Sequence, residues 1–283
     1  MKPFKNFIFF YRLTKGNFTF NIVLENSIKK GEGNFLTYGE FAKIYDELIN
    51  EDINYEEMCS RIIEICNGEN INFNNYLDIA CGTGNVTVKL AKSFKESFAV
   101  DLSDDMLREA FDKLKKEKIK CKLICQDMSE LSLNRKFDLI TSVLDSSNYI
   151  IEESKFVDYL TRVKEHLNDD GIFIFDINSY YKLSEILGNN IYTYSEEDVF
   201  YTWENTFEDD LLSMYLTFFV KKGELYERFE EEHLERAYKE SFIENKLKEL
   251  DLKVIGKFDG YSNRKVENQT ERIMYVVKKW WRN

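Results

Sequence analysis

The chain has 283 residues, 43% of them hydrophobic and 32% charged, and a formal net charge of −12 at pH 7. This composition is typical of a soluble globular protein that is large enough to bury a core without covalent staples. The negative charge argues against an extended nucleic-acid interface, because phosphate binding depends on clustered lysine and arginine side chains. We therefore expect a small molecule, and no nucleic acid, as the partner.

The cysteines and the apolar stretches bear on the compartment of the protein. Five cysteines are present, and no two of them form a CxxC pair, so neither a disulfide framework nor a metal site is predicted. The apolar stretch FIFFY at residues 7–11 is too short to span a membrane. These features predict a cytoplasmic protein with reduced thiols that does not bind a membrane.

The beginning of the chain divides into two parts. Residues 1–35 contain one candidate strand, FTFNIVL, followed by the loop KKGEG, and are expected to form an N-terminal extension. From Tyr38 the apolar residues recur at helical spacing through Tyr45, and YEEMCSRIIEIC at 55–66 predicts a second helix.

Residues 74–178 alternate short apolar runs with amphipathic stretches. The intervening stretches have clear helix signals, such as the N-cap residue Ser103 followed by Asp104 and Asp105 in the first turn. Consecutive apolar residues are typical of parallel strands that are buried on both faces of a sheet. The five runs are NYLDIA, SFAVDL, KCKLICQD, FDLITSVLD and GIFIFDI. This order predicts an α/β fold with a parallel sheet and helices on both faces.

The pattern changes to a period of two between residues 190 and 236. DVFYTWENTF, LLSMYLTFFV and LYERFEEEHLERAY are separated by short turns and predict an inserted three-stranded antiparallel β meander. The helix SFIENKLKEL then leads to LKVIGKFDGY and RIMYVVKKW, which complete a seven-stranded, mostly parallel main sheet. The predicted main domain comprises residues 36–189 and 237–283, and residues 190–236 form the insert.

The loop after the first predicted strand is the expected ligand site, because ligands of open α/β sheets bind at the carboxyl ends of the strands. Its sequence, LDIACGTGN at 77–85, contains two glycines of a G-x-G-x-x-G fingerprint, but the third position is Thr87. Asp101 ends the second strand 17 residues after Gly84, close to the roughly 20 residues expected of an acid that binds a ribose diol. The pattern indicates an adenosine-containing ligand.

Acidic residues end four successive predicted strands, namely Asp78, Asp101, Asp127 and Asp145. Such a rim would repel the pyrophosphate of NAD, whereas it would attract a ligand with an ammonium and a sulfonium group. S-adenosylmethionine fits this charge pattern and NAD does not.

Four sequence segments resemble the motifs of class I S-adenosylmethionine-dependent methyltransferases, in the order of that family. They are LDIACGTGN, AVDLSDDML, CQDMSEL and FDLITSVLDSSNYI. The opening YGEFAKIYDELI, the β insert and the ending ERIMYVVKK are most similar to small-molecule enzymes of bacterial type, including amino-sugar N-methyltransferases. The resemblance implies a Rossmann-like main domain and S-adenosylmethionine as the cofactor.

The resemblance also implies roles for residues of the first loop. The backbone around Ala80, Gly82 and Gly84 would approach the methionine part of the cofactor, with Asp78 near its amino group. Tyr38, on the helix that closes over the cofactor in the family, would bind the methionine carboxylate or pack in the core.

On the adenosine side, the resemblance implies contacts from three later motifs. Asp101 would accept hydrogen bonds from the ribose, while Leu102 and Met106 would pack on the adenine. Asp127 would accept a hydrogen bond from the exocyclic amine of the adenine, beside Met128.

Two residues follow the fourth strand at the reacting end of the cofactor. Leu144 would lie under the sulfonium, and Asp145 would contact the cofactor or acceptor, or else cap the next helix.

The predicted catalytic residues are Tyr45, Tyr149 and His233. Tyr45 has core packing as its alternative role, and His233 has the role of an ordinary buried strand histidine.

The predicted function is methyl transfer by in-line displacement to a nitrogen or oxygen of a small molecule, in a monomer or homodimer. Only two histidines are present, which favours nitrogen because a neutral amine needs no strong base. The single proline, Pro3, rules out the Pro-containing motifs of enzymes that methylate DNA bases. An NAD-dependent oxidoreductase and a non-catalytic, regulatory S-adenosylmethionine-binding protein are the alternatives.

Overall fold

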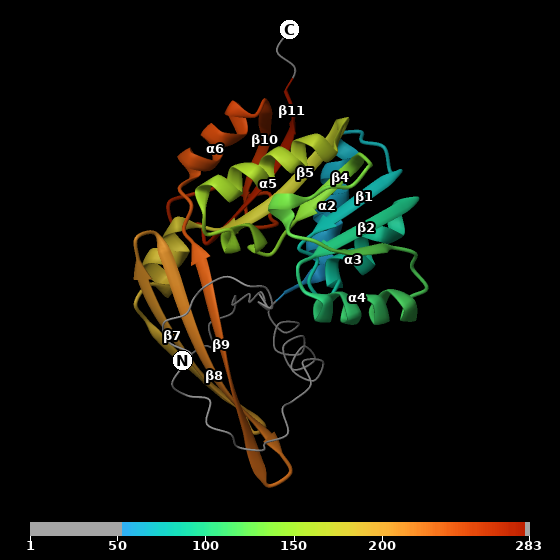
Figure 1. Cartoon of the computed structure of the whole chain (residues 1–283). Coiled ribbons are helices and arrows are strands. Elements are labelled where there is room, and N and C mark those ends of the chain that lie inside the picture. Colours follow the sequence, from blue (N-terminus) through green and yellow to red (C-terminus); the bar gives the residue numbers. More distant parts are fainter. Residues whose placement is uncertain (1–52, 281–283) are drawn as a thin grey trace.

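Seven strands form the main sheet of the computed structural model, which describes residues 53–280 (Figure 1). Their order across the sheet is β10-β11-β5-β4-β1-β2-β3, and β11 alone runs antiparallel to both its neighbours. The strands are β1 (Asn75–Ile79), β2 (Glu96–Asp101), β3 (Lys122–Cys125), β4 (Phe137–Ser142), β5 (Leu167–Asn178), β10 (Leu252–Asp259) and β11 (Arg272–Lys279). The predicted seven-stranded, mostly parallel sheet is confirmed.

Helices cover both faces of this sheet. On one face, α2, α3 and α4 pack on a layer that includes Tyr76, Ala99 and Leu139. On the other face, α5 and α6 pack on a layer that includes Leu77 and Phe173. The helices are α2 (Tyr55–Gly68), α3 (Asn85–Leu90), α4 (Asp104–Lys116), α5 (Glu153–His166) and α6 (Glu240–Glu249).

Helix α4 begins where the sequence predicts it. The side chain of Ser103 accepts a hydrogen bond from the backbone N–H of Met106 at 3.3 Å, and two aspartates occupy the first turn. Lysines fill the last turn, so the charges oppose the helix dipole at both ends. These contacts fix the helix that follows the end of β2.

The strand order reverses between β1 and β4, which lie side by side with parallel strands on either side of them. The loops after β3, β2, β1 and β4 therefore gather at one edge of the sheet, at the switch point where ligands of this architecture bind. Two of these loops form short 3-10 turns, η3 (Met128–Glu130) and η4 (Ser146–Tyr149).

The insert is a separate antiparallel sheet that extends from this end of the main domain (Figure 1). Its strands are β6 (Ile191–Ser195), β7 (Val199–Glu208), β8 (Leu211–Lys222) and β9 (Leu225–Arg236). The prediction of three strands was therefore one too few. The additional strand, β6, has only five residues and lies at the edge of the sheet, where it depends on pairing with β7.

One face of the insert packs on η5 (Lys182–Leu187), a π-helical turn after β5. Trp203 and Leu216 are buried against Leu183 and Leu187 in this contact. Tyr215 lies on the opposite face and is largely exposed. Trp203 therefore has a packing role in the insert.

Within residues 53–280, no helix is both long and apolar enough to cross a membrane. The predicted N-terminal extension and the residues Tyr38 and Tyr45 lie outside the described residues.

Candidate active site

The loop between β1 and α3 takes left-handed backbone conformations at alternate positions. The φ angles of Ala80, Gly82 and Gly84 are 54°, 55° and 79°. A Cβ atom on Gly84 would lie 2.9 Å from the Cβ of Ala110 in α4, closer than side chains pack. Gly84 is therefore required both for the turn and for the close approach of α4 to the loop.

Asp101, at the end of β2, holds this loop through its carboxylate. Its Oδ2 accepts a hydrogen bond from the backbone N–H of Gly82 at 2.7 Å, and its Oδ1 accepts one from Ser103 at 2.9 Å. Each oxygen keeps a further lone pair for a ligand. Burial raises the pKa of Asp101, while the backbone hydrogen bonds oppose that rise.

The residues after Asp101 fit an adenosine group. The side chain of Leu102 is 43% exposed next to the carboxylate, whereas Met106, in the first turn of α4, is buried. A carboxylate with free lone pairs beside an exposed apolar side chain suits a ribose diol followed by an adenine ring. The donor and packing groups present thus fit the predicted cofactor.

Asp127 lies on the neighbouring strand end, after β3. Its Oδ1 accepts hydrogen bonds from the backbone N–H and the hydroxyl of Ser129, both at 2.8 Å, and so caps η3. Met128 is half-buried against the main core. Because Asp101 pairs with Cys125 in the sheet, Asp127 lies near the proposed adenosine position.

Asp78 lies inside the protein rather than on an open rim. The hydroxyl of Thr87 donates to its Oδ2 at 2.6 Å, and the hydroxyl of Thr141 donates to its Oδ1 at 2.7 Å. Tyr76 supports Thr141 through a 2.8 Å contact between their hydroxyl groups. Burial raises the pKa of Asp78 to about 6 even though these hydrogen bonds lower it.

This contact also explains the incomplete glycine fingerprint. A dinucleotide site needs a small third residue for close packing of helix and strand. Here Thr87 takes that position and is fully buried, and its hydroxyl binds the carboxylate of Asp78. The loop is therefore built around a buried acid at the position where the fingerprint has a glycine.

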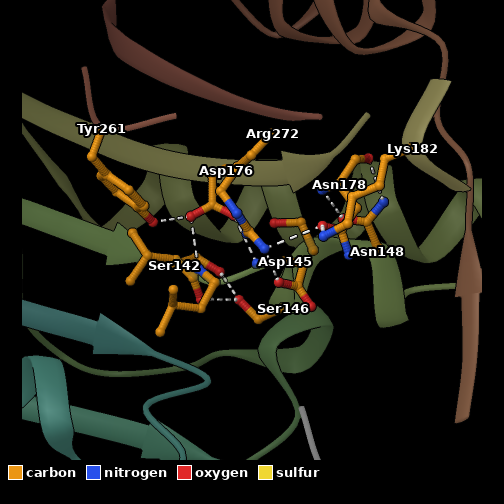
Figure 2. Close-up of polar contacts among 12 residues, drawn as sticks. Ser142, Asp145, Ser146, Asn148, Asp176, Asn178, Lys182, Tyr261 and Arg272 are labelled. Atoms are coloured by element: carbon orange, nitrogen blue, oxygen red, sulfur yellow. Dashed lines mark hydrogen bonds and ion pairs between the residues drawn. The ribbon is translucent and has the colours of Figure 1, made fainter. Parts of the chain in front are cut away.

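The turn after β4 is strained. Leu144 and Asp145 have φ angles of 62° and 56°, in the left-handed region that residues other than glycine rarely adopt. The carboxylate of Asp176, at the end of β5, accepts both of their backbone N–H groups at 2.7 Å (Figure 2). The hydroxyl of Tyr261 also donates to Asp176, and these contacts hold the turn in place.

The alternative interpretation, in which Asp145 caps the following turn η4, is wrong. Its side chain makes no capping hydrogen bond and is fully buried. Arg272, at the start of β11, contacts it through Nη2 at 2.5 Å and contacts Asp176 through Nη1. Figure 2 shows Arg272 between the two carboxylates. The ion pair draws the side chain of Asp145 into the protein and away from the η4 backbone.

A second group of polar side chains joins the main sheet to the insert. Asn148 donates to the backbone carbonyls of Asn178 and Arg236, and it accepts from the backbone N–H of Asn178. Asn178 in turn donates to Glu235 at 2.9 Å and accepts from Lys182 at 2.9 Å. Asn148 thus connects η4 to β5 and β9.

Two predicted catalytic residues meet at the junction with the insert. The hydroxyl of Tyr149, in η4, lies 3.4 Å from Nδ1 of His233, in β9, and the two rings pack edge to face. Both side chains are buried. Residues separated by 84 positions in the chain are therefore adjacent, close to the turn that contains Asp145.

The other histidine, His166, has a structural role at the end of α5. Nε2 of His166 accepts a hydrogen bond from the backbone N–H of Leu133 at 2.8 Å, which requires that nitrogen to be unprotonated. Nδ1 contacts the carbonyl oxygen of Arg162 at 2.7 Å and donates its proton there. His166 is therefore a neutral link between α5 and the loop before β4.

The sequence analysis missed Asp176, Lys182, Glu235 and Arg272 as members of the site. Signals for two of them were present, because Asp176 ends the fifth apolar run and Arg272 begins the last one. Glu235 was not recognised because it lies in a run of acidic residues that is typical of an exposed strand face. In the part of the chain that the structure describes, no three His, Cys, Asp or Glu side chains are placed as metal ligands.

Comparison with known proteins agrees with this geometry. Residues 77–171 match the family model of a methyltransferase domain. A putative methyltransferase of Geobacillus sp. (strain WCH70) is 31% identical over 253 residues, which cover 86% of this chain and 100% of that protein. A crystal structure of an S-adenosylmethionine-dependent methyltransferase from Clostridium acetobutylicum has 55% identity and a TM-score of 0.83, and the match covers 86% of this chain and 99% of the other.

A more distant relative has a named acceptor. The dTDP-3-amino-3,4,6-trideoxy-alpha-D-glucopyranose N,N-dimethyltransferase of Streptomyces venezuelae is 26% identical over 136 residues, which cover 48% of this chain and 56% of that protein. These similarities do not favour the NAD-dependent oxidoreductase or the non-catalytic regulatory protein that the sequence left open. The chain belongs to the S-adenosylmethionine-dependent methyltransferases, and S-adenosylmethionine is its cofactor.

Proposed function

We propose that the protein transfers a methyl group from S-adenosylmethionine to a nitrogen or oxygen of a small molecule. The observation that carries this proposal is the contact between Tyr149 and His233 at the end of β4. It brings a hydroxyl and an imidazole from the main domain and the insert to the switch-point edge of the sheet, where the cofactor loops also lie.

When bound, the cofactor supplies an electrophilic methyl group that is transferred by in-line displacement. Asp101 would hold the ribose, Leu102 and Met106 would flank the adenine, and Asp127 with Met128 would contact its far side. The backbone at Ala80, Gly82 and Gly84 would approach the amino-acid end, and Asp78 would face its ammonium group. These are the roles that the resemblance to the family implies, and the strand ends at the switch point, the lone pairs and the apolar surface described above support them.

On the acceptor side, Leu144 and Asp145 are fixed by Asp176 and Arg272. A fixed turn next to the reacting groups supports orientation, which can lower a barrier by about 7 to 11 kcal/mol in favourable cases. Tyr149 and His233 would position the acceptor, and His233 could remove a proton if the acceptor is a hydroxyl. The amino-sugar relative indicates a small polar acceptor.

The experiment is a methyl-transfer assay with purified protein, S-adenosylmethionine and fractionated small-molecule extract. S-adenosylhomocysteine and a methylated product are expected to form together. Tyr149→Phe and His233→Asn are each expected to lower kcat/KM by about tenfold, since each removes one hydrogen-bonding group from the pair.

Tyr226→Phe is the matched control, because this tyrosine is exposed on β9 and its hydroxyl donates to a loop carbonyl, that of Glu197, at 3.4 Å. It is expected to keep full activity. Absence of any methylated product would contradict the proposed function, and unchanged kinetics in both site variants would contradict the roles of Tyr149 and His233.

A further inference from the structure

Five ionisable side chains are buried together where the insert meets the main sheet. All are at least nine-tenths buried, and when ionised they carry three negative charges and two positive ones. They are Asp145, Asp176, Lys182, Glu235 and Arg272. With all five groups ionised, the cluster has one negative charge more than it has positive charges, and the half-buried Glu271 adds further negative potential at Lys182.

The two cations of the cluster are not shared equally among its three carboxylates. Arg272 serves both Asp145 and Asp176, and its Nη2 also lies 3.1 Å from Oδ1 of Asn178. Lys182 donates to the same oxygen of Asn178, and the amide of Asn178 donates to Glu235. One cation thus neutralises two carboxylates directly, while the other reaches Glu235 only through a neutral side chain.

One atom of the cluster lacks a partner among the described residues. Oδ2 of Asp145 is buried and accepts no hydrogen bond, although Oδ1 of the same carboxylate is paired with Arg272. A buried acceptor without a donor is costly, and an uncompensated buried charge costs more. Burial raises the pKa of Asp145 well above its usual range, against the opposing charge of Arg272 and with Glu235 and Asp176 acting in the same direction as burial. The free protein therefore favours the protonated acid, and a cation bound at Oδ2 would favour the ionised form.

The position of Asp145 connects this deficit to the acceptor. Asp145 lies on the strained turn directly after Leu144. The turn η4 begins at the next residue and ends at Tyr149, whose hydroxyl contacts His233. His233 and Glu235 are two residues apart on β9, so both project from the same face of the insert. The negative cluster and the Tyr149–His233 pair are therefore parts of one region at the end of β4.

We propose that Asp145 and the excess negative charge around it form a subsite for an ammonium group of the methyl acceptor. An ammonium group would donate a hydrogen bond to Oδ2 and supply the missing positive charge. A hydroxyl could supply only the hydrogen bond, and a carboxylate would be repelled.

The subsite has a recognition role. A nitrogen that attacks the methyl group must be unprotonated, so the atom that is methylated is a neutral nitrogen or oxygen elsewhere in the same acceptor. The substrate class is therefore an amine with at least one further nucleophilic group. This inference rests on the proposed function, because it places the acceptor beside Asp145.

The test compares three probes of similar shape but different charge, namely cyclohexylamine, cyclohexanol and cyclohexanecarboxylate. Their binding to the full chain is measured by ligand-observed NMR titration at pH 7 with saturating S-adenosylhomocysteine. Cyclohexylammonium is expected to bind at least about tenfold more tightly than the alcohol, as for a charge-assisted hydrogen bond. Equal binding of the amine and the alcohol, tighter binding of the carboxylate, or binding of no probe would overturn the proposal.

Variants locate the effect. Asp145→Asn keeps the shape of the side chain and is expected to abolish the preference for the amine, and Glu235→Gln is expected to reduce it. Glu232→Gln, on the exposed face of β9, is the control and keeps the preference. A preference that survives in folded Asp145→Asn would overturn the assignment.

The comparison of probes on the native protein needs no variant, so it stands even if Asp145→Asn fails to fold. Binding of S-adenosylhomocysteine is recorded separately in the same samples. Failure of the subsite with intact cofactor binding and methyl transfer is thereby distinguished from failure of the proposed function.

Discussion

The site has two proposed halves, a cofactor half around Asp101 and the loop after β1, and an acceptor half around Asp145 and the junction with the insert. They are built in different ways, although both lie at the same edge of the main sheet. The proposed cofactor half uses backbone N–H groups and acids that are satisfied by neighbouring loops and strand ends, as with Asp101, which accepts from Gly82 and Ser103. The acceptor half uses side chains from β5, β9, β11 and η5 that meet only in the folded protein. Contacts between neighbouring loops therefore shape the proposed cofactor half, and long-range ion pairs shape the proposed acceptor half.

The largest expected effect tests the ion pairs of the acceptor half. Arg272→Met removes the cation between Asp145 and Asp176 and leaves two buried carboxylates uncompensated, which typically costs about 3 to 5 kcal/mol. We expect this loss in the free energy of unfolding measured with urea. Arg264→Met, which breaks an exposed pair with Asp259, is the control and should change stability little; an equal loss in both would contradict the comparison.

The next effect tests the packing of the cofactor half. Gly84→Ala combines a left-handed backbone with a 2.9 Å approach to Ala110, and we expect it to lower the free energy of unfolding by about 2 to 4 kcal/mol. Gly223→Ala is a matched control, because Gly223 has a φ of 67° but no atom within 4 Å of the added Cβ. The difference between the two variants measures the close contact alone, and equal losses would show that α4 moves away freely.

A smaller effect concerns Asp101, the acid that is proposed to bind the ribose of the cofactor. Asp101→Ala removes the carboxylate that holds Gly82 and is proposed to bind the ribose, so the affinity for S-adenosylhomocysteine should fall by roughly tenfold or more. Isothermal titration measures this change. Exposed Asp169, which pairs with Lys279, provides a control substitution that should not affect binding. Unchanged affinity in Asp101→Ala would remove this residue from the cofactor site.

The smallest effect depends on pH. The pKa of Asp78 is raised to about 6, so its carboxylate is mostly ionised at pH 7 and about nine-tenths protonated at pH 5. If the ammonium group of the cofactor requires the ionised form, the affinity for S-adenosylhomocysteine should fall by about tenfold from pH 7 to pH 5. Asp78→Asn should bind more weakly at pH 7 and lose most of this dependence. A native protein whose affinity is the same at both values would contradict the role of Asp78.

The same shift affects stability with a definite sign. Because the folded-state pKa of Asp78 lies above its unfolded value of 3.8, its contribution favours folding below that value and is lost as the pH rises through about 6. On going from pH 7 to pH 4, the native protein is therefore expected to gain stability relative to Asp78→Asn, which does not titrate at this position. Urea unfolding at pH 4 and pH 7 measures the difference.

The cofactor half and the main sheet could be predicted because their signals are local. Apolar runs predicted the strands, Ser103 predicted the start of α4, and the final two runs were correctly joined to the main sheet. The fourth strand of the insert was missed because β6 is short and depends on its partner β7.

The acceptor half could not be predicted to the same extent. Asp145 was identified from its place at a strand end, but its partner Arg272 is 127 residues away and no local pattern links the two. Tyr149 and His233 were selected separately, and only the fold shows that they are in contact. Pairs of this kind depend on the order of the strands in the sheet, and no short segment of the sequence determines that order.

The place of Arg272 in the chain also has a consequence for folding. Arg272 opens the last strand, and its two ion pairs close loops of 96 and 127 residues. The cofactor loop can form from contacts within about 20 residues, whereas Asp145 and Asp176 remain without their cation until β11 has been synthesised and inserted between β5 and β10. Contacts of such high sequence separation form late, because the chain loses the entropy of closing a long loop before these contacts stabilise it. On the ribosome, the acceptor half should therefore be the last part of the enzyme to become native.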